Sequence, residues 1–297
     1  MQKNHSLKDW VIATRPWSFP ASSMPVLTTV FILNAQHTTV HWWLGLWALV
    51  NIIFVHAAGN TWSDYFDYKR GVDREDTYGV KTITSGDFTP QQIFRLSLLL
   101  QVIAILMGIG LILLTGWTLL WIGIAGVCLS LLYPPLKYIA LGDVVIMLCY
   151  AFLPMIGTSF ITSGEIHWNV LWYSVPIGLI TVAILHSNNT RDIETDQRAG
   201  IKTFSMLTGR AVAANIYCFE VSFPYVWMLL LCILSLAPWW AMISWVSLPL
   251  AFKNIAMMMS YKKQGIQSFA QLDEGTAKLQ MAFSFSLILG LILASFF

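Results

Sequence analysis

Charged side chains are scarce in this chain: they make up only 11% of its 297 residues. A soluble domain of average composition carries roughly a quarter charged residues. Hydrophobic residues instead reach 57%. The shortage of charge therefore excludes an ordinary soluble domain and predicts an integral membrane protein, whose surroundings are the lipid bilayer.

Features that would indicate other classes of protein are also weak or missing. The formal net charge is only +2, so we expect no nucleic-acid partner. The first ten residues lack the form of a cleavable signal peptide, so we expect the first apolar span to be retained. The few cysteines all fall in apolar stretches without the spacing of a metal site, and we interpret them as small core residues: Cys128, Cys149, Cys218 and Cys232.

Apolar stretches of about 20 residues, the length needed to cross a bilayer, recur along the whole chain. Because a backbone in contact with lipid must satisfy its own hydrogen bonds, we expect these stretches to be helices. The sequence thus predicts an all-α, polytopic membrane protein with about nine transmembrane helices, in a single domain over residues 1–297. The predicted spans are 19–36, 42–63, 94–114, 116–133, 141–162, 168–187, 211–235, 238–258 and 279–297.

Lysine and arginine are concentrated before the first span and in alternate loops, whereas the other loops contain almost none. The positive-inside rule then places the N-terminus in the cytoplasm and the C-terminus outside. We expect a multi-pass protein of the inner, cytoplasmic membrane. The basic residues that carry this prediction include Lys3, Lys8, Arg15, Lys69, Arg70, Arg74, Lys81, Arg95, Lys137, Arg191, Arg198, Lys202, Arg210, Lys262, Lys263 and Lys278.

Two matching polar clusters lie where apolar spans end. In each, an asparagine precedes an aspartate by four residues, and a second aspartate follows three or four residues later. On a helix such residues share one face. Carboxylates in or near a bilayer are costly and usually mark a functional site. The first aspartate cluster is Asn60, Asp64 and Asp67, and the second is Asn188, Asp192 and Asp196.

The two clusters favour hard divalent cations, above all Mg²⁺ held jointly with a phosphate. A long polar loop follows each cluster, and such loops are usually functional. If both clusters close over one cavity, the ions would neutralise a diphosphate while lysine and arginine bind its remaining oxygens. Polar residues at one end and apolar walls suit the diphosphate ester of an allylic lipid, whose carbocation an electron-rich aromatic ring can attack.

Five segments in this order resemble the UbiA superfamily of intramembrane aromatic prenyltransferases: RPWSFPASSMPVL (15–27), DYFDYKRGVD (64–73), SG (85–86), YPPLKYIALGD (133–143) and NNTRDIETDQRAGIKT (188–203). Within it, the segments DYFDYKRGVD, YPPLKY with LGD, and NNTRDIETDQRAGIKT are most similar to the 1,4-dihydroxy-2-naphthoate prenyltransferase branch. The resemblance implies nine transmembrane helices around a central cavity. It also implies Mg²⁺-dependent transfer of a polyprenyl group from its diphosphate to this aromatic acid, with loss of CO₂, to give demethylmenaquinone in menaquinone biosynthesis.

The resemblance also implies roles for individual positions. The catalytic aspartates would be Asp64, Asp67, Asp192 and Asp196, which would ligate the metal together with Asp73. The residues expected to bind the diphosphate are Asn60, Asn188, Arg191 and Lys137, with Lys81 and Lys202 as weaker candidates.

Some questions stay open at the level of sequence. Asp143 is either a helix N-cap or a site residue, and no role is assigned to His56, His186 or Glu220. One alternative function is a UbiA-type prenyltransferase with a different aromatic acceptor. Another is a transporter, because intramembrane carboxylates also form ion pathways. The acids concentrate at one membrane face, which favours the enzyme. The prenyl chain length and oligomeric state are not determined.

Overall fold

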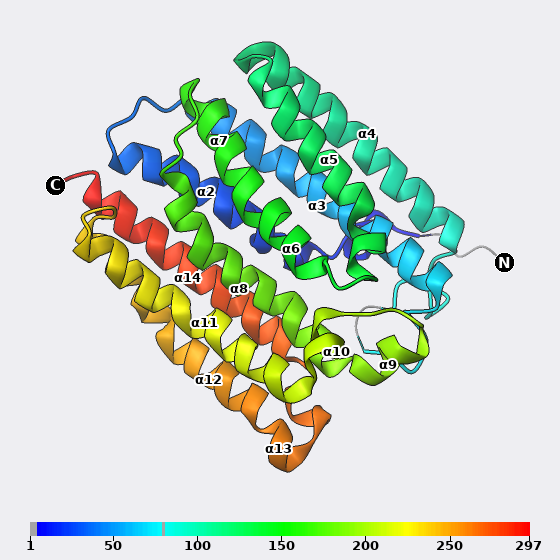
Figure 1. Ribbon diagram of the computed structural model, residues 1–297. Helices are drawn as coiled ribbons and strands as arrows, with labels where there is room; N and C mark the ends of the chain where they lie inside the picture. The colour runs from blue at the N-terminus through cyan, green and yellow to red at the C-terminus, as the bar shows by residue number, and fades with distance from the viewer. Residues whose placement is uncertain (1–4, 79–80) are drawn as a thin grey trace.

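Helices dominate the computed structural model, which describes residues 5–78 and 81–297 (Figure 1). Within these residues there is no β-strand, and eight helical segments are long and apolar enough to cross a membrane. The predicted all-α, polytopic fold is confirmed. Lys3, used above for the orientation, lies outside the described residues.

Most membrane-crossing segments begin and end within a few residues of the predicted spans, but the second continues to Arg70 and the last begins at Ile266. Three of them consist of consecutive helical pieces rather than one regular α-helix, and these are joined by dashes below. The eight segments are α3 (Trp42–Arg70), α4 (Pro90–Thr115), α5 (Thr118–Lys137), α6–η2–α7 (Gly142–Met147, Leu148–Phe152, Leu153–Ser163), α8 (Val170–Arg191), α11 (Arg210–Ile233), η3–α12–α13 (Trp239–Ser247, Leu248–Met259, Tyr261–Gln264) and η4–α14 (Ile266–Phe269, Leu272–Ala294).

The first predicted span, residues 19–36, corresponds to α2 (Pro20–Ala35), which has only 16 residues. A 3₁₀ turn, η1 (Pro16–Ser18), precedes it directly, and Phe19 between them has helical backbone angles. The helical path therefore runs from Pro16 to Ala35, close to the length that crosses a bilayer. Counted with the eight longer segments, α2 agrees with the prediction of about nine spans.

The helix α14 lies inside the bundle and packs against α2, α8, α12 and η3 (Figure 1). Large apolar side chains of α8, α11 and α14 form the main core there, including the fully buried Tyr173, Tyr217 and Phe283. In contrast, α4 and α5 lie at an edge of the bundle (Figure 1), and many of their apolar side chains are exposed, as expected for helices that face lipid.

Short helices gather at one end of the bundle, opposite the C-terminus (Figure 1). They are α9 (Ile193–Arg198), α10 (Phe204–Thr208) and α13 (Tyr261–Gln264), while α1 (Leu7–Ala13) precedes the bundle proper. The carboxyl ends of α3 and α8 reach this same end, and these are the helix ends that carry the two aspartate clusters.

Candidate active site

A cavity of about 700 Å³ is lined by residues of α3, α4, α5, α7 and α8. Its walls toward the membrane interior are apolar, with side chains such as Ile52, Ile112 and Leu119. Its other end is polar, and the two clusters meet there as predicted. The charged side chains and neighbouring amides at this end are Arg15, Asn60, Asp67, Asp73, Lys137, Asn188, Asn189, Arg191, Asp192 and Asp196, and the amides of Asn51 and Gln101 also line the cavity.

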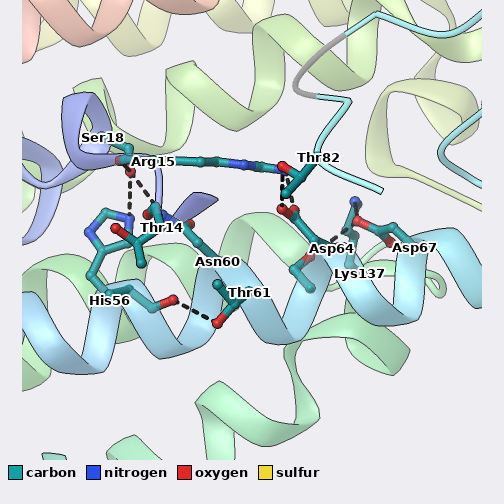
Figure 2. Close-up of polar contacts among 12 residues, drawn as sticks. Thr14, Arg15, Ser18, His56, Asn60, Thr61, Asp64, Asp67, Thr82 and Lys137 are labelled. Atoms are coloured by element: carbon teal, nitrogen blue, oxygen red, sulfur yellow. Dashed lines mark hydrogen bonds and ion pairs between the residues drawn. The ribbon is translucent and has the colours of Figure 1, made fainter. Parts of the chain in front are cut away.

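Asp64 lies on α3, is buried, and forms an ion pair with Arg15 (Figure 2). The Thr82 hydroxyl lies 3.4 Å from its second carboxylate oxygen. Asp64 borders a smaller space beside the main cavity, which Asp73 also lines. From the sequence, Arg15 served as a topology signal and as the first residue of a family-like segment, and its contact with Asp64 was not predicted.

Arg15 reaches Asp64 from a turn with a left-handed backbone, φ 59° and ψ 60°, directly before Pro16. This conformation is unfavourable for a residue with a Cβ. The Asn60 side-chain amide donates to the Thr14 carbonyl (2.9 Å) and to Ser18 Oγ (3.0 Å), and thereby ties the turn to α3 (Figure 2). Asn60 therefore lines the cavity and also holds the segment that carries Arg15.

Asp67, one helical turn after Asp64, is buried and accepts three hydrogen bonds. The donors are Lys137 Nζ at 2.9 Å, Tyr138 Oη at 2.8 Å and Ser63 Oγ at 3.1 Å. Asp73 follows in the loop after α3. Burial, reinforced by the carboxylates of Asp67 and Asp64, raises the pKa of Asp73 to about 7.

The second aspartate cluster surrounds the junction of α8 and α9. Arg191 binds both carboxylate oxygens of Asp192, each at 2.8 Å, and also donates to the Ala270 carbonyl at 2.8 Å. Asp196 is buried, and this burial raises its pKa to about 7. The Asn188 Oδ1 atom is buried without a hydrogen-bond partner in the described part of the chain.

Two of the predicted diphosphate-binding residues lie elsewhere. Lys81 is exposed and its Nζ donates to the Glu75 carbonyl. Lys202 is also exposed, and its backbone pairs with the segment around Tyr138 and Ile139. The structure does not bring these two amino groups to the cavity, whereas it does bring Lys137 and Arg191 there.

The site's donors fit Mg²⁺ shared with a diphosphate. Among the described residues, no three His, Cys, Asp or Glu side chains come close enough to hold a metal ion by themselves. Mg²⁺ usually takes one or two carboxylates, together with phosphate oxygens and water. The unpartnered Asn188 Oδ1 lies beside Asp192 on the cavity wall and supplies a further hard oxygen. These carboxylate and amide oxygens are the ligand type that Mg²⁺ prefers.

The residues left open by the sequence form two buried groups. His56 bonds to Ser18 Oγ (3.2 Å) and Ser22 Oγ (2.8 Å). His186 bonds to Glu220 (3.1 Å) and lies 3.7 Å from Asp143. Asp143 is inside the first turn of α6 and makes no capping hydrogen bond, so the N-cap interpretation was wrong.

Comparisons with known proteins agree with this geometry. The model of the UbiA prenyltransferase family matches residues 23–273. The chain is 32% identical to UbiA prenyltransferase domain-containing protein 1 of Gallus gallus, over 96% of this chain and 85% of that protein. It is 28% identical to the 1,4-dihydroxy-2-naphthoate octaprenyltransferase of Bacillus subtilis, over 95% of this chain and 92% of that protein.

Solved structures share the fold. A UbiA homologue from Aeropyrum pernix K1 superposes with a TM-score of 0.69 at 15% identity, covering 92% of this chain and 97% of that one. A homologue from Archaeoglobus fulgidus, bound to GPP and Mg²⁺, has a TM-score of 0.60 at 13% identity, covering 94% and 99%.

Proposed function

Since the chain belongs to the UbiA prenyltransferase family and is an intramembrane prenyltransferase of that type, we propose that it prenylates an aromatic acid in a Mg²⁺-dependent reaction. The donor is a long all-trans polyprenyl diphosphate. The acceptor is 1,4-dihydroxy-2-naphthoate, and the product is demethylmenaquinone, a precursor of menaquinone. The observation that carries this proposal is that Asp67, Asp73, Asp192 and Asp196, from both aspartate clusters, meet at one end of a cavity whose walls are mostly apolar.

The polar end of the cavity would bind the diphosphate. Asp64, Asp67, Asp192 and Asp196, with Asp73 and Asn188, would hold Mg²⁺, which when bound neutralises the diphosphate and makes it a better leaving group. Arg15, Lys137 and Arg191 now neutralise these carboxylates. In the complex their N–H groups would turn to phosphate oxygens, for which a guanidinium or ammonium is a strong donor.

The apolar walls would hold the prenyl chain and keep water from the allylic cation. The acceptor ring then forms a bond from its carboxyl-bearing carbon to the first carbon of the prenyl group. The carboxylate leaves as CO₂, and the electron pair of the broken bond restores the aromatic ring. No strong protein base is needed, which suits a site whose carboxylates bind metal.

The choice of acceptor rests on sequence likeness and on this chemistry. The Bacillus subtilis relative is named for 1,4-dihydroxy-2-naphthoate, and a dihydroxylated ring is rich in electrons. Membership of a prenyltransferase family also favours the enzyme over the transporter considered above. We place the chain in the cytoplasmic membrane with its N-terminus inside. The basic loops and short helices at the aspartate end of the bundle support this orientation.

Product analysis tests the proposal. The purified protein is incubated with Mg²⁺, a polyprenyl diphosphate and a panel of 1,4-dihydroxy-2-naphthoate, 4-hydroxybenzoate and homogentisate, and the products are identified by mass spectrometry. We expect a prenylated naphthalene that lacks the carboxyl group. A clear preference for either monocyclic acid would contradict the acceptor and leave prenyl transfer intact.

A further inference from the structure

Gly59 of α3 leaves a notch in the cavity wall. A Cβ at this position would lie 3.6 Å from Ser130 Oγ of α5 and 4.0 Å from Tyr150 Oη of the π-helical turn η2. All three residues line the cavity. Two hydroxyl groups from different elements therefore border one small space that only a residue without a side chain leaves open.

Neither hydroxyl has a hydrogen-bond partner within the described residues. Other tyrosine hydroxyls near the core are paired: Tyr217 with Thr276 at 2.7 Å, and Tyr225 with Ser247 at 2.7 Å. The two notch residues are instead half-buried on the cavity wall, where water or a bound molecule can supply the hydrogen bond that the protein does not. The two open hydroxyls at the notch are thus available to a bound molecule.

The ring of Tyr150 is held in place from behind. It packs edge-on against His56, with ring centroids 4.7 Å apart. Both nitrogens of His56 are in turn fixed by Ser18 and Ser22. The π-helical turn Leu148–Phe152 presents Tyr150 to the cavity, and such turns occur frequently at functional sites. The hydroxyl is therefore preorganised.

The depth of the notch matches the place of the reacting ring. Gly59 precedes Asp64 by five residues, which is about 7.5 Å along the helix axis. If the diphosphate lies at the aspartates, the acceptor must lie about one or two turns further into the membrane, beside the first prenyl carbon. The cavity's charged side chains cluster at the aspartates, so the notch offers neutral hydroxyls and suits a neutral polar substituent.

We propose that the notch formed by Gly59, Ser130 and Tyr150 binds a ring hydroxyl of the aromatic acceptor and so helps to select hydroxylated acceptors. This inference rests on the proposed prenyl transfer. It assigns Ser130 and Tyr150 as specificity-determining residues, and Gly59 as the residue that makes room for the substituent.

Three variants test the notch: Tyr150→Phe, Ser130→Ala and Gly59→Ala. Each should raise KM for the acceptor about tenfold, because the first two changes remove a hydrogen-bonding hydroxyl and the third fills the space for the substituent. Each should leave KM for the prenyl diphosphate within about twofold. Gly59→Ala should fold well, because the new methyl makes only ordinary contacts and alanine favours a helix. The matched control is Tyr261→Phe in α13, which removes a tyrosine hydroxyl outside the cavity lining and should leave acceptor KM unchanged.

A second measurement pairs the protein change with a ligand change. In the wild-type protein, 1-hydroxy-2-naphthoate should bind about tenfold more weakly than the dihydroxy acid if the missing hydroxyl occupies the notch. In Tyr150→Phe or Ser130→Ala, that difference should shrink toward onefold. If Tyr150 and Ser130 had only a structural role, each variant would weaken the binding of both acids by the same factor.

The outcomes separate the two proposals. If the wild-type protein prenylates an aromatic acid but all three variants keep a normal acceptor KM, or if donor and acceptor KM rise together, the notch assignment is wrong and prenyl transfer stands. If the wild-type protein yields no prenylated aromatic product, the proposed function fails, and the notch inference fails with it.

Discussion

Three basic side chains each hold one of the aspartates proposed to bind the metal: Arg15 with Asp64, Lys137 with Asp67, and Arg191 with Asp192. Each pair is largely shielded from solvent. An unpaired charge would be costly there, so each cation stabilises its carboxylate before ligand binds. The same three cations can then bind the diphosphate. These three residues thus act both in the ligand-free site, where they pair with aspartates, and in the proposed complex, where they would bind the diphosphate.

Removing a carboxylate should therefore damage catalysis strongly. We expect Asp64→Asn and Asp192→Asn each to lower the rate at least about a hundredfold, because each removes a charge from the metal site. Glu165→Gln, at an exposed loop position after α7, is the control and should keep the normal rate. Near-normal turnover of both aspartate variants, with intact folding, would show that the ligand assignment is wrong.

Arg15 is predicted to act on the donor. Arg15→Gln should raise KM for the prenyl diphosphate at least tenfold, since a charge-assisted hydrogen bond to phosphate is lost. Arg15→Lys should recover part of this, because it keeps the charge but not the forked geometry. Lys8→Gln, a nearby exposed charge, should have no effect. If Arg15→Gln and the wild-type protein have the same KM for the prenyl diphosphate, Arg15 does not bind the donor.

The raised pKa values of Asp73 and Asp196, about 7 each, predict a pH effect on metal binding. Below pH 7 these carboxyl groups carry a proton that Mg²⁺ must displace. The Mg²⁺ concentration for half-maximal rate should thus rise about tenfold or more between pH 8 and pH 6, and change little above pH 8. A half-saturation value that is constant over this range would contradict the shifted pKa values.

The aspartates could be predicted from sequence because their spacing is local to one helix. Arg15 could not, since it lies 49 positions from Asp64 and reaches it only through a left-handed turn before Pro16. The Gly59 notch could not be predicted either, because it depends on how a glycine of α3 packs beside hydroxyls from two other elements. Contacts of this kind depend on packing, which a single sequence does not state.

Among the elements, α3 and α14 show why the predicted span ends were displaced. The prediction ended the second span at residue 63, yet α3 continues to Arg70 and ends at Gly71, whose φ is 74°. It began the last span at 279, yet α14 begins at Leu272, with Asp273 and Glu274 in its first turn. The charged residues at the end of α3 mark where the helix leaves the membrane, not where the helix itself ends. In α14, acidic residues are favoured in the first turn because the N-terminus of a helix carries a partial positive charge.

The loop after α3 covers the site. Thr77 and Tyr78 line the cavity, the ring of Tyr78 lies 4.9 Å from the Arg191 guanidinium, and Gln267 donates to its hydroxyl at 2.8 Å. Asp76 also pairs with Arg198 at 2.9 Å. The loop therefore links the first aspartate cluster with the second.

This position predicts protection of the loop by substrate. A cysteine at Thr77→Cys should react with a membrane-impermeant reagent only from the cytoplasmic side, and more slowly when Mg²⁺ and prenyl diphosphate are present, because loop closure excludes water. Labelling of the wild-type protein measures the reaction of its native cysteines and is subtracted as background. Labelling from the outer side would overturn the orientation, and a rate insensitive to substrate would rule out closure.

At the scale of the whole molecule, hydropathy was sufficient to predict an all-helical bundle, because a lipid-exposed chain has few other ways to satisfy its backbone. The order in which helices pack was not predictable in this way. The helix α14 packs against α2 and α8, which are distant from it in the sequence. No local sequence pattern predicts which helices will be its neighbours.

The inner position of α14 has a consequence for biosynthesis. The helix α2 is made early and α8 later, but their shared neighbour α14 is translated only after residue 271. At usual elongation rates, α2 therefore waits on the order of tens of seconds for this partner. Until then the side chains that pack on α14 in the finished bundle, such as Tyr217, whose hydroxyl pairs with Thr276 of α14, lack their partner.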